Sequence, residues 1–253
     1  MAAGEVAGCA GYWVVDQNGA VAAFGAVINF GSAPQLPAAR VVAITATPDY
    51  DGYWLLTSNG RVYAFGDAPA LGSAYKDHPA SPLVGMATTS DGNGYWLVSA
   101  SGHVYAYGDA LSFGSVSRYA SRLNGPIAGI AASPHGRGYW LVGTDGGVFG
   151  FGTVDFFGSV AQKHLRGRIV GIAPAASTSG YPGPSHPGYT LAAADGGIFA
   201  FGSGFYGSLA NRLSGTPLEA ITPAVGSNGY YVMNSGGQIY AYGDARYLGN
   251  AVR

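Results

Sequence analysis

The chain has 253 residues, 10% of them charged, and a net charge of −1 at pH 7, which excludes a molecule that binds polyanions through its overall charge. No apolar run approaches the ~20 residues of a membrane-spanning helix, and the first ten residues lack the basic start and apolar core of a signal peptide. The single cysteine, Cys9, excludes an internal disulfide and a cysteine-based metal site.

One sequence unit, written GYWLVGTDGGVFGFGTVDFFGS in residues 138–159, occurs six times along the chain. A fixed period of this kind is the signature of a repeat architecture, in which each copy is one supersecondary unit. The six copies begin at Gly11, Gly52, Gly94, Gly138, Gly188 and Gly229.

Each copy predicts four strands, which follow one another in the same order. A small apolar segment comes first, such as VVAITA before the second copy, and the aromatic GYW segment follows it. A turn such as Asn59-Gly60 then leads into a strand that alternates large and small residues, because such pairs accept the positive φ of a tight hairpin. A short segment such as NFGS, residues 29–32, is expected to be the fourth strand. In the first copy the small apolar segment is VAGCA, which makes Cys9 a core position.

Four strands in about 40–45 residues is the period of a propeller blade, so the sequence predicts an all-β fold. We expect one domain over residues 1–253, a six-bladed β-propeller with four antiparallel strands per blade. We place the Ala- and Gly-rich strand innermost because blades crowd together near the axis, and Glu219 on such a strand would mark a polar channel. The blades are expected at residues 5–32, 41–73, 83–115, 127–159, 169–208 and 218–250.

The repeat resembles the tandem units of actinobacterial secreted and cell-surface proteins, which follow the pattern GYWLV-x-x-DGG-V-F-x-FGDA-x-FYGS. The resemblance covers all six copies at GYW, the turn glycines, FG or YG, and the final GS. The fifth copy departs from it at Tyr189-Thr190, and the sixth departs at Tyr230-Tyr231 and at Asn250. The resemblance implies an exported propeller module, extracellular or at the cell surface, whose signal peptide is absent from this sequence. It implies no settled activity.

The residues that recur in every copy are interpreted mostly as structure. Four tryptophans at one register could form sugar-stacking platforms, but Thr190 and Tyr231 replace them in two copies, which favours a core position. The aspartates of the GDA segments, Asp67, Asp109 and Asp244, each offer one carboxylate where calcium needs several oxygen ligands. We therefore expect these aspartates to stabilise turns, and we expect no cofactor.

Function in a repeat protein is expected where the copies differ, in the connectors between blades. We expect the connectors that lead from a last strand to the next first strand to share a face with the hairpin turns. Eight of the twelve Lys and Arg residues lie there: Arg40, Lys76, Arg118, Arg122, Lys163, Arg166, Arg168 and Arg212. Most acids fall on the opposite face: Asp49, Asp51, Asp67, Asp91, Asp109, Asp155 and Asp244. The sequence therefore predicts a basic face that binds anions around the mouth of a central channel.

Two functions remain open. The first is a monomeric binding module for a glycan, an acidic cell-wall polymer or a small anion, held by the eight cations. Nucleic acid is not expected, since no aromatic-basic strand pattern appears. The second is a hydrolase of an ester, lactone or phosphoester at the channel mouth, with Asp77, His78 and His164 as bases or ligands of a metal ion and Arg118, Arg122 and Arg168 as oxyanion donors.

The longest insertion lies between the fifth inner segment and the fifth GYW segment, in residues 174–188. It contains Ser185-His186, but adjacency in sequence does not make a catalytic dyad, and no nucleophile elbow surrounds the pair. We interpret this insertion as an irregular surface loop, because it contains four prolines and three glycines.

Overall fold

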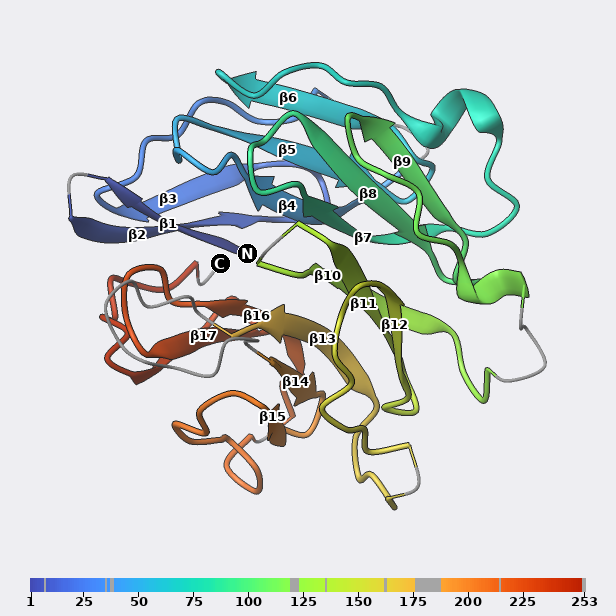
Figure 1. Ribbon diagram of the computed structural model, residues 1–253. Helices are drawn as coiled ribbons and strands as arrows, with labels where there is room; N and C mark the ends of the chain where they lie inside the picture. Colours follow the sequence, from blue (N-terminus) through green and yellow to red (C-terminus); the bar gives the residue numbers. More distant parts are fainter. Residues whose placement is uncertain are drawn as a thin grey trace. The chain divides into compact units, whose positions relative to one another are not determined.

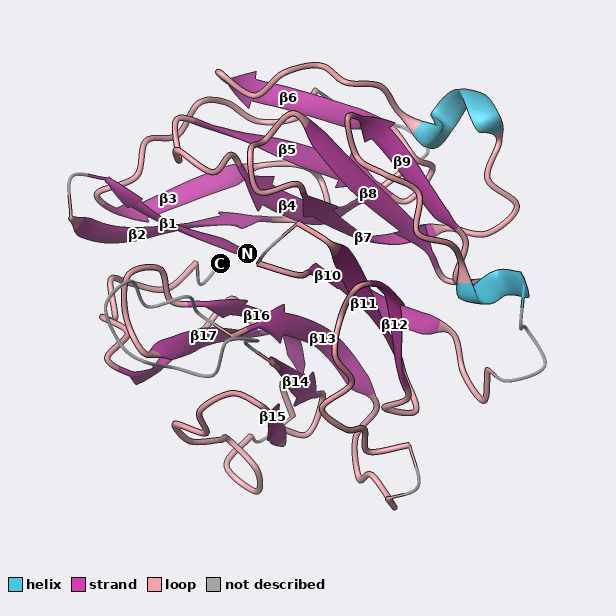
Figure 2. Cartoon of the chain, in the orientation of Figure 1, coloured by secondary structure: helices cyan, strands magenta, loops and turns pink. Residues whose placement is uncertain are grey.

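The computed structural model describes residues 1–253 apart from Ala7, Gln35, 37–38, 119–122, His135, Gln162, 176–187, Ser214 and 252–253. The protein is all-β, with 44% strand and 3% helix. Its described residues form six three-stranded antiparallel sheets, each built from three strands in chain order (Figures 1 and 2). The chain divides into two compact units, residues 1–122 and 123–253, which are described in turn.

The first unit holds three sheets and the short 3-10 helix η1, and residues 116–118 form a further 3-10 turn (Figure 2). The sheets and the helix are β1 (Ala2–Val6), β2 (Cys9–Val15) and β3 (Val21–Gly25); β4 (Val41–Ala46), β5 (Gly52–Thr57) and β6 (Val62–Gly66); η1 (Ala74–Asp77); and β7 (Leu83–Thr88), β8 (Gly94–Ser99) and β9 (Val104–Gly108).

The second unit holds the other three sheets. They are β10 (Ile127–Ala132), β11 (Gly138–Gly143) and β12 (Val148–Gly152); β13 (Ile169–Pro174), β14 (Tyr189–Ala193) and β15 (Ile198–Phe201); and β16 (Leu218–Pro223), β17 (Gly229–Asn234) and β18 (Ile239–Gly243).

Within each unit, neighbouring sheets approach one another most closely along their first strands. In the first unit β1 contacts β4 and β4 contacts β7, and in the second β10 contacts β13 and β13 contacts β16 (Figure 1). Small residues permit this approach: a Cβ on Gly171 of β13 would lie 3.3 Å from Ile221 of β16. The Ala- and Gly-rich strand is therefore the strand at which the sheets converge, as the sequence predicts.

The tryptophans of the GYW segments are core residues, which confirms the prediction. Trp54 is 0% exposed, and its indole N–H donates to the carbonyl of Pro69, 2.8 Å away in the last segment of the same copy. Trp13, Trp96 and Trp140 make the same bond to Ile28, Leu111 and Asp155. In the sixth copy the hydroxyl of Tyr231 donates to the carbonyl of Arg246 instead, 3.1 Å away. Each ring thus ties the last segment of its copy to its own sheet.

The tyrosine after the first glycine of a copy ties its sheet to the preceding copy of the same unit in the four copies that have one. Tyr95 is 0% exposed, and its hydroxyl donates to the carbonyl of Gly72 at 2.6 Å. Tyr53, Tyr189 and Tyr230 make the corresponding bonds to Gly31, Gly158 and Gly207. Burial raises the pKa of Tyr95 to about 12, because the charged phenolate is disfavoured away from water.

The fourth strand expected in each copy is not among the strands of the structure. The segments that would form it each contain a glycine with φ between 121° and 139°, which is incompatible with a regular strand. These glycines are Gly31, Gly72, Gly114, Gly158, Gly207 and Gly249. Segments such as NFGS therefore run along their sheets as irregular chain, held by side chains rather than by a strand ladder.

The prediction that Cys9 is a core residue is wrong. The first strand of the first sheet is Ala2–Val6, four residues earlier than the expected VAGCA segment, and Gly8 with φ 75° turns the chain into β2. Val6 pairs with Cys9 directly across this turn, so the cysteine begins β2 and is exposed. The first copy lacks the longer loop that joins the first two strands in the other copies, and the strand shifts accordingly.

Glu219 lies in the first strand of its sheet, as expected, but its side chain is exposed. The pairing of β16 with β17 shifts register between Leu218 and Ala220, which makes Glu219 the extra residue of a β-bulge. A bulged residue leaves the ladder and can turn toward water, so no buried acid has to be compensated here.

Candidate functional site

The connectors lie against the hairpin turns of the same unit, as the sequence predicts. In the second copy the backbone N–H of Tyr75 donates to the carbonyl of Gly60, 3.2 Å away, and in the fifth copy Leu209 donates to Gly196 at 3.0 Å. The residues that differ between copies are therefore carried on a backbone that is fixed to the hairpins.

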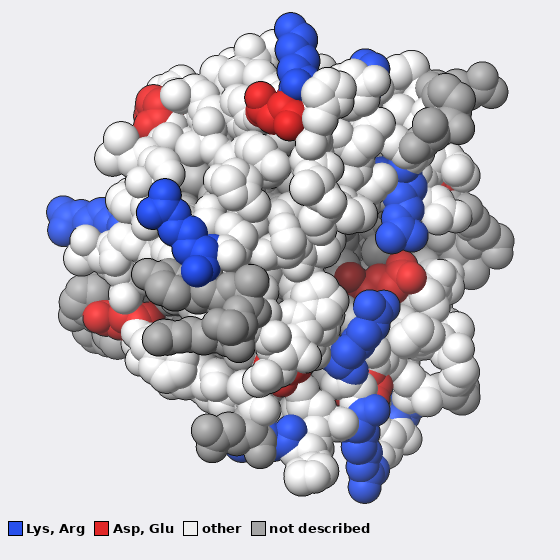
Figure 3. Space-filling view, turned by 90° about the vertical axis from the view of Figure 1, so that its right-hand side faces the viewer, with Lys and Arg blue, Asp and Glu red and all other residues white. Residues whose placement is uncertain are grey.

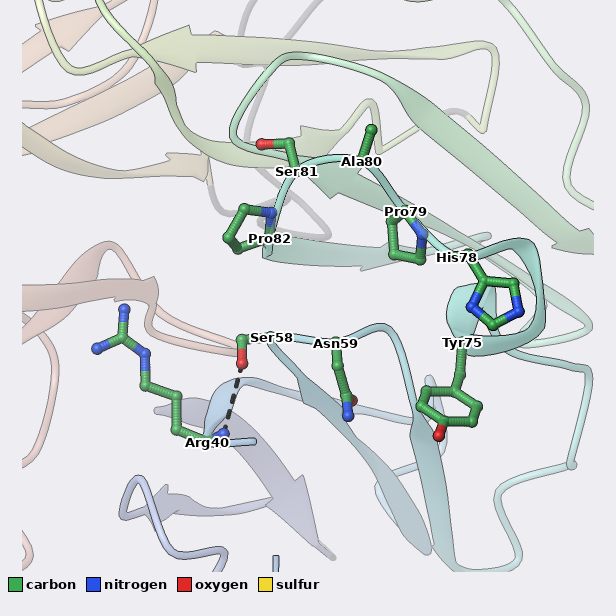
Figure 4. A pocket seen from close by; sticks show the side chains of 9 residues that line it. All are labelled: Arg40, Ser58, Asn59, Tyr75, His78, Pro79, Ala80, Ser81 and Pro82. Atoms are coloured by element: carbon green, nitrogen blue, oxygen red, sulfur yellow. Dashed lines mark hydrogen bonds between the residues drawn. The ribbon is translucent and has the colours of Figure 1, made fainter. Parts of the chain in front are cut away.

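A pocket of about 500 Å³ opens on this surface in the first unit. It collects side chains from three segments that are distant in the sequence: the connector that ends at Arg40, the β5–β6 turn at Ser58-Asn59, and the connector from Tyr75 to Pro82 (Figure 4). Figure 4 shows Arg40 and His78 at opposite ends of this pocket, with Asn59 between them. The remaining lining residues are Pro79, Ala80 and Ser81.

Ser58 fixes the two connectors that border the pocket. Its backbone N–H donates to the carbonyl of Arg40 at 2.8 Å, and its own carbonyl accepts from Leu83, the first residue of β7, at 2.9 Å. The Ser58 hydroxyl also accepts a longer bond, 3.4 Å, from the backbone N–H of Arg40. The main chain at Arg40 is therefore fixed while its exposed guanidinium stays available to a ligand.

The floor of the pocket presents one oriented amide and one aromatic ring. The hydroxyl of Thr57 donates to Oδ1 of Asn59 at 2.7 Å, which leaves the NH₂ group as the end of this amide that can donate to a ligand. The ring of Tyr75 is held by the guanidinium of Arg61, 3.8 Å from its centroid. Sequence reasoning missed Arg61, because it lies between the hairpin turn and β6 and not in a connector, although its place directly after the hairpin glycine is a usable signal.

None of the described residues that line the pocket is acidic. The nearest acid along the chain, Asp77, is engaged elsewhere: its Oδ2 accepts a hydrogen bond from Tyr107 at 2.8 Å. Burial and this carboxylate together raise the pKa of Tyr107. Asp77 and Lys76 line a separate pocket of about 610 Å³ with Tyr95 and Tyr107. The electrostatic character of the first pocket is therefore set by Arg40.

The groups named for hydrolysis are not assembled within one unit. His78 borders the first pocket, Asp77 binds Tyr107, and His164 belongs to the second unit. No group of three His, Cys, Asp or Glu residues that could hold a metal ion occurs in the part of the chain that the structure describes. Ser185-His186 lies outside the described residues.

The other predicted cations are exposed on connectors. Arg118 follows β9 in the first unit, and Arg122 lies outside the described residues. In the second unit Lys163, Arg166 and Arg168 precede β13, and Arg212 precedes β16. Figure 3 shows Lys and Arg side chains that project from the surface, several of them beside Asp or Glu side chains. That all eight cations share one face stays a prediction, because each unit is described by itself.

The acidic loops at the other ends of the strands contain paired carboxylates in the first unit. Asp91 accepts hydrogen bonds from the hydroxyl of Thr89 at 2.7 Å and from the Asn93 amide at 3.0 Å, and these bonds lower its pKa. Burial and the neighbouring Asp91 raise the pKa of Asp109. Asp49 and Asp67 form the same kind of pair. The interpretation of Asp67 and Asp109 as simple turn residues misses this pairing.

No helix among the described residues is long and apolar enough to cross a membrane. No protein-family model matches the sequence, and no curated protein is similar enough to it to count as a relative.

Proposed function

We propose that this chain is a binding module for an acidic glycan, which is bound in the pocket between Arg40 and His78 with its acidic group on Arg40. The observation that carries the proposal is the composition of the pocket. An arginine, a histidine, an oriented amide, hydroxyl groups and an aromatic ring surround it, and no acid is found among its described lining residues. An anionic or neutral polar ligand suits such a site, and a cationic one does not.

Each group has a definite role in this proposal. The guanidinium of Arg40 pairs with a carboxylate through two parallel hydrogen bonds, which a lysine cannot do. The NH₂ group of Asn59 and the imidazole of His78 donate to sugar hydroxyls, while the ring of Tyr75 and the proline faces offer apolar contact to a sugar ring. The protein acts as a monomer without a cofactor.

We further propose that the six sheets are the blades of one six-bladed propeller and that the protein is exported to the cell surface. Three features support the propeller: the six-fold repeat, the convergence of small first strands within each unit, and the equivalent tyrosine bonds between successive copies. Export is supported by the resemblance of the repeat to units of secreted proteins. A cell-wall polymer that carries uronic acids is an available ligand in that setting.

The test is a titration with trigalacturonate, followed by NMR through the side-chain signals of His78 and Arg40. The His78 signals should shift in a saturable way, and their apparent Kd should rise as NaCl is increased from 50 to 500 mM. Arg40→Glu should raise the Kd read at His78 at least about tenfold, because a charge-assisted hydrogen bond contributes about 1.5–3 kcal/mol.

Two controls make this test specific. Arg137→Glu changes a cation of the same kind on a loop at the other ends of the strands and should leave the Kd within about twofold. The neutral trisaccharide maltotriose should bind at least tenfold more weakly than trigalacturonate. If maltotriose binds equally well, or if Arg40→Glu leaves the Kd at His78 unchanged, the acidic-ligand proposal is wrong.

A further inference from the structure

The backbone scheme that positions Arg40 is common to the later copies, and in the second unit it again holds an arginine. Arg168 directly precedes β13, as Arg40 directly precedes β4, and the backbone N–H of Ala194 donates to its carbonyl at 2.9 Å. The carbonyl of Ala194 in turn accepts from Leu218, the first residue of β16, at 2.9 Å. Ala194 therefore holds Arg168 as Ser58 holds Arg40.

The position of His78 also has a counterpart. His78 donates its backbone N–H to the carbonyl of Tyr75, the residue that is bonded to the hairpin glycine of its copy. In the fifth copy Leu209 is bonded to the hairpin glycine, and Arg212 donates to the carbonyl of Leu209 at 2.8 Å. By these hydrogen bonds Arg212 occupies the place of His78, so Arg168 and Arg212 correspond to Arg40 and His78.

Arginine is not a general feature of this place in the repeat. The residue before the first strand is proline in the third, fourth and sixth copies, at Pro82, Pro126 and Pro217. In the five copies after the first, an arginine holds this place in the second and the fifth, which are the middle sheets of the two units. The recurrence is therefore a property of these two copies and not of the repeat.

The second cluster is also tied together and charged in a comparable way. Nη1 of Arg166 donates to Oδ1 of Asn211 at 3.1 Å, which joins the connector of Arg168 to that of Arg212. Asp195 stands where Asn59 stands in the first pocket, and its Oδ1 accepts from Gly197 within the turn at 3.0 Å. Three arginines, Arg166, Arg168 and Arg212, against this one aspartate leave the cluster net positive, as Arg40 leaves the first pocket. Close approach of the connector to this turn requires Gly167, where a Cβ would lie 2.6 Å from the backbone nitrogen of Asp195.

We propose that Arg168 and Arg212 form a second anion-binding site, equivalent to the Arg40–His78 pocket, so that the chain binds two acidic groups, one in each unit. The existence of the site rests on the repeated hydrogen bonds and charges. Its assignment to the carboxylate of an acidic glycan rests on the proposed function.

The experiment follows the Nε–Hε signals of the arginines by NMR during titrations with sodium sulfate and with trigalacturonate. Arg40→Lys, Arg168→Lys and Arg212→Lys assign the three signals, because each substitution removes one of them. All three signals should shift in a saturable way. Arg168→Glu should abolish the response of Arg212 and leave the Kd read at Arg40 within about twofold. Arg40→Glu should raise the Kd read at His78 at least about tenfold and leave the Kd read at Arg168 within about twofold. Arg137→Glu should change neither site.

The outcomes separate the two proposals. A response at Arg40 alone overturns the second site and leaves the first intact. A response at Arg168 and Arg212 alone supports the second site and overturns the first pocket. Saturable shifts at both sites with sulfate but not with trigalacturonate support two anion sites and overturn the acidic-glycan assignment. If neither probe shifts any of these signals, both proposals are wrong. Melting curves of the glutamate variants within a few degrees of wild type exclude unfolding as the cause of a lost response.

Discussion

The bond between Tyr95 and Gly72 offers the sharpest test of how successive sheets are held together. Tyr95→Phe removes one hydroxyl from a ring that is 0% exposed and leaves the carbonyl of Gly72 without the partner that lies 2.6 Å away. The loss of a buried hydrogen bond with one partner left behind costs about 1–2 kcal/mol. For a chain of this size that corresponds to a fall in Tm of roughly 3–6 °C.

The same substitution has a pH signature. The pKa of Tyr95 is about 12 in the folded protein against an ordinary value of 10.0, so the folded state holds this proton more tightly than the unfolded chain. The stability that this proton linkage contributes is complete below about pH 10 and is lost as the pH rises from 10 toward 12. Phenylalanine cannot ionise, so the difference in stability between wild type and Tyr95→Phe should be largest at pH 8 and should shrink by pH 11.5.

The assay is urea denaturation of both proteins at pH 8, 10 and 11.5, followed by circular dichroism. The other buried tyrosines titrate in wild type and variant alike, so the difference between the two proteins reports Tyr95. Tyr240→Phe is the matched control, since the Tyr240 hydroxyl bonds the exposed side chain of Gln238 at 3.1 Å, and its removal should cost under about 0.5 kcal/mol. A difference that stays constant from pH 8 to 11.5, or a Tyr95→Phe variant as stable as wild type, would refute the reasoning.

Two other substitutions test the turns and the acidic loops. Gly60→Val should destabilise by about 1 kcal/mol or more in thermal denaturation, because φ is 90° there and a Cβ would lie 3.0 Å from the backbone of Tyr75; an unchanged Tm contradicts the hairpin assignment. Asp109→Asn should raise the Tm slightly at pH 7, since the raised pKa of Asp109 shows that the folded protein disfavours its ionised form beside Asp91. Below pH 3.8, the ordinary pKa of an aspartate, the Asp109 carboxyl is protonated and as neutral as an asparagine amide, so the gain should vanish. A gain that persists there, or an equal gain from Asp244→Asn at pH 7, contradicts the carboxylate pairing.

The features that the sequence predicts correctly are those that local sequence patterns determine. The turn at Asn59-Gly60 and the burial of Trp54 follow from a glycine with positive φ and from aromatic residues placed between sheets. The convergence of the small first strands follows from side-chain size alone. Because six copies repeat each pattern, a local preference that is weak in one copy becomes decisive over the whole chain.

The features that the sequence does not predict depend on contacts between segments that are separated in the sequence, within a copy or between copies. The segment around Gly31 has the aromatic composition of a strand, but the glycine takes φ 139° where a Cβ would lie 2.8 Å from the ring of Phe65 in the next sheet. The Arg61–Tyr75 stack joins a strand to a connector, and the Asp91–Asp109 pair joins two loops of one sheet. The candidate pocket is predicted only in part for the same reason: the charge of Arg40 is visible in the sequence, and its neighbours Asn59 and Tyr75 are not.

The division between repeated and variable residues has a physical basis in the hydrogen bonds. A tryptophan such as Trp96 holds the last segment of its own copy. A tyrosine such as Tyr95 holds the last segment of the preceding copy. These bonds and the connector bonds to the hairpin glycines are made by backbone carbonyls, which every residue type possesses. A connector side chain can therefore change from proline to arginine without altering the bonds that position it. This is why the variable residues Arg40 and Arg168 can carry a binding function on a backbone that remains the same.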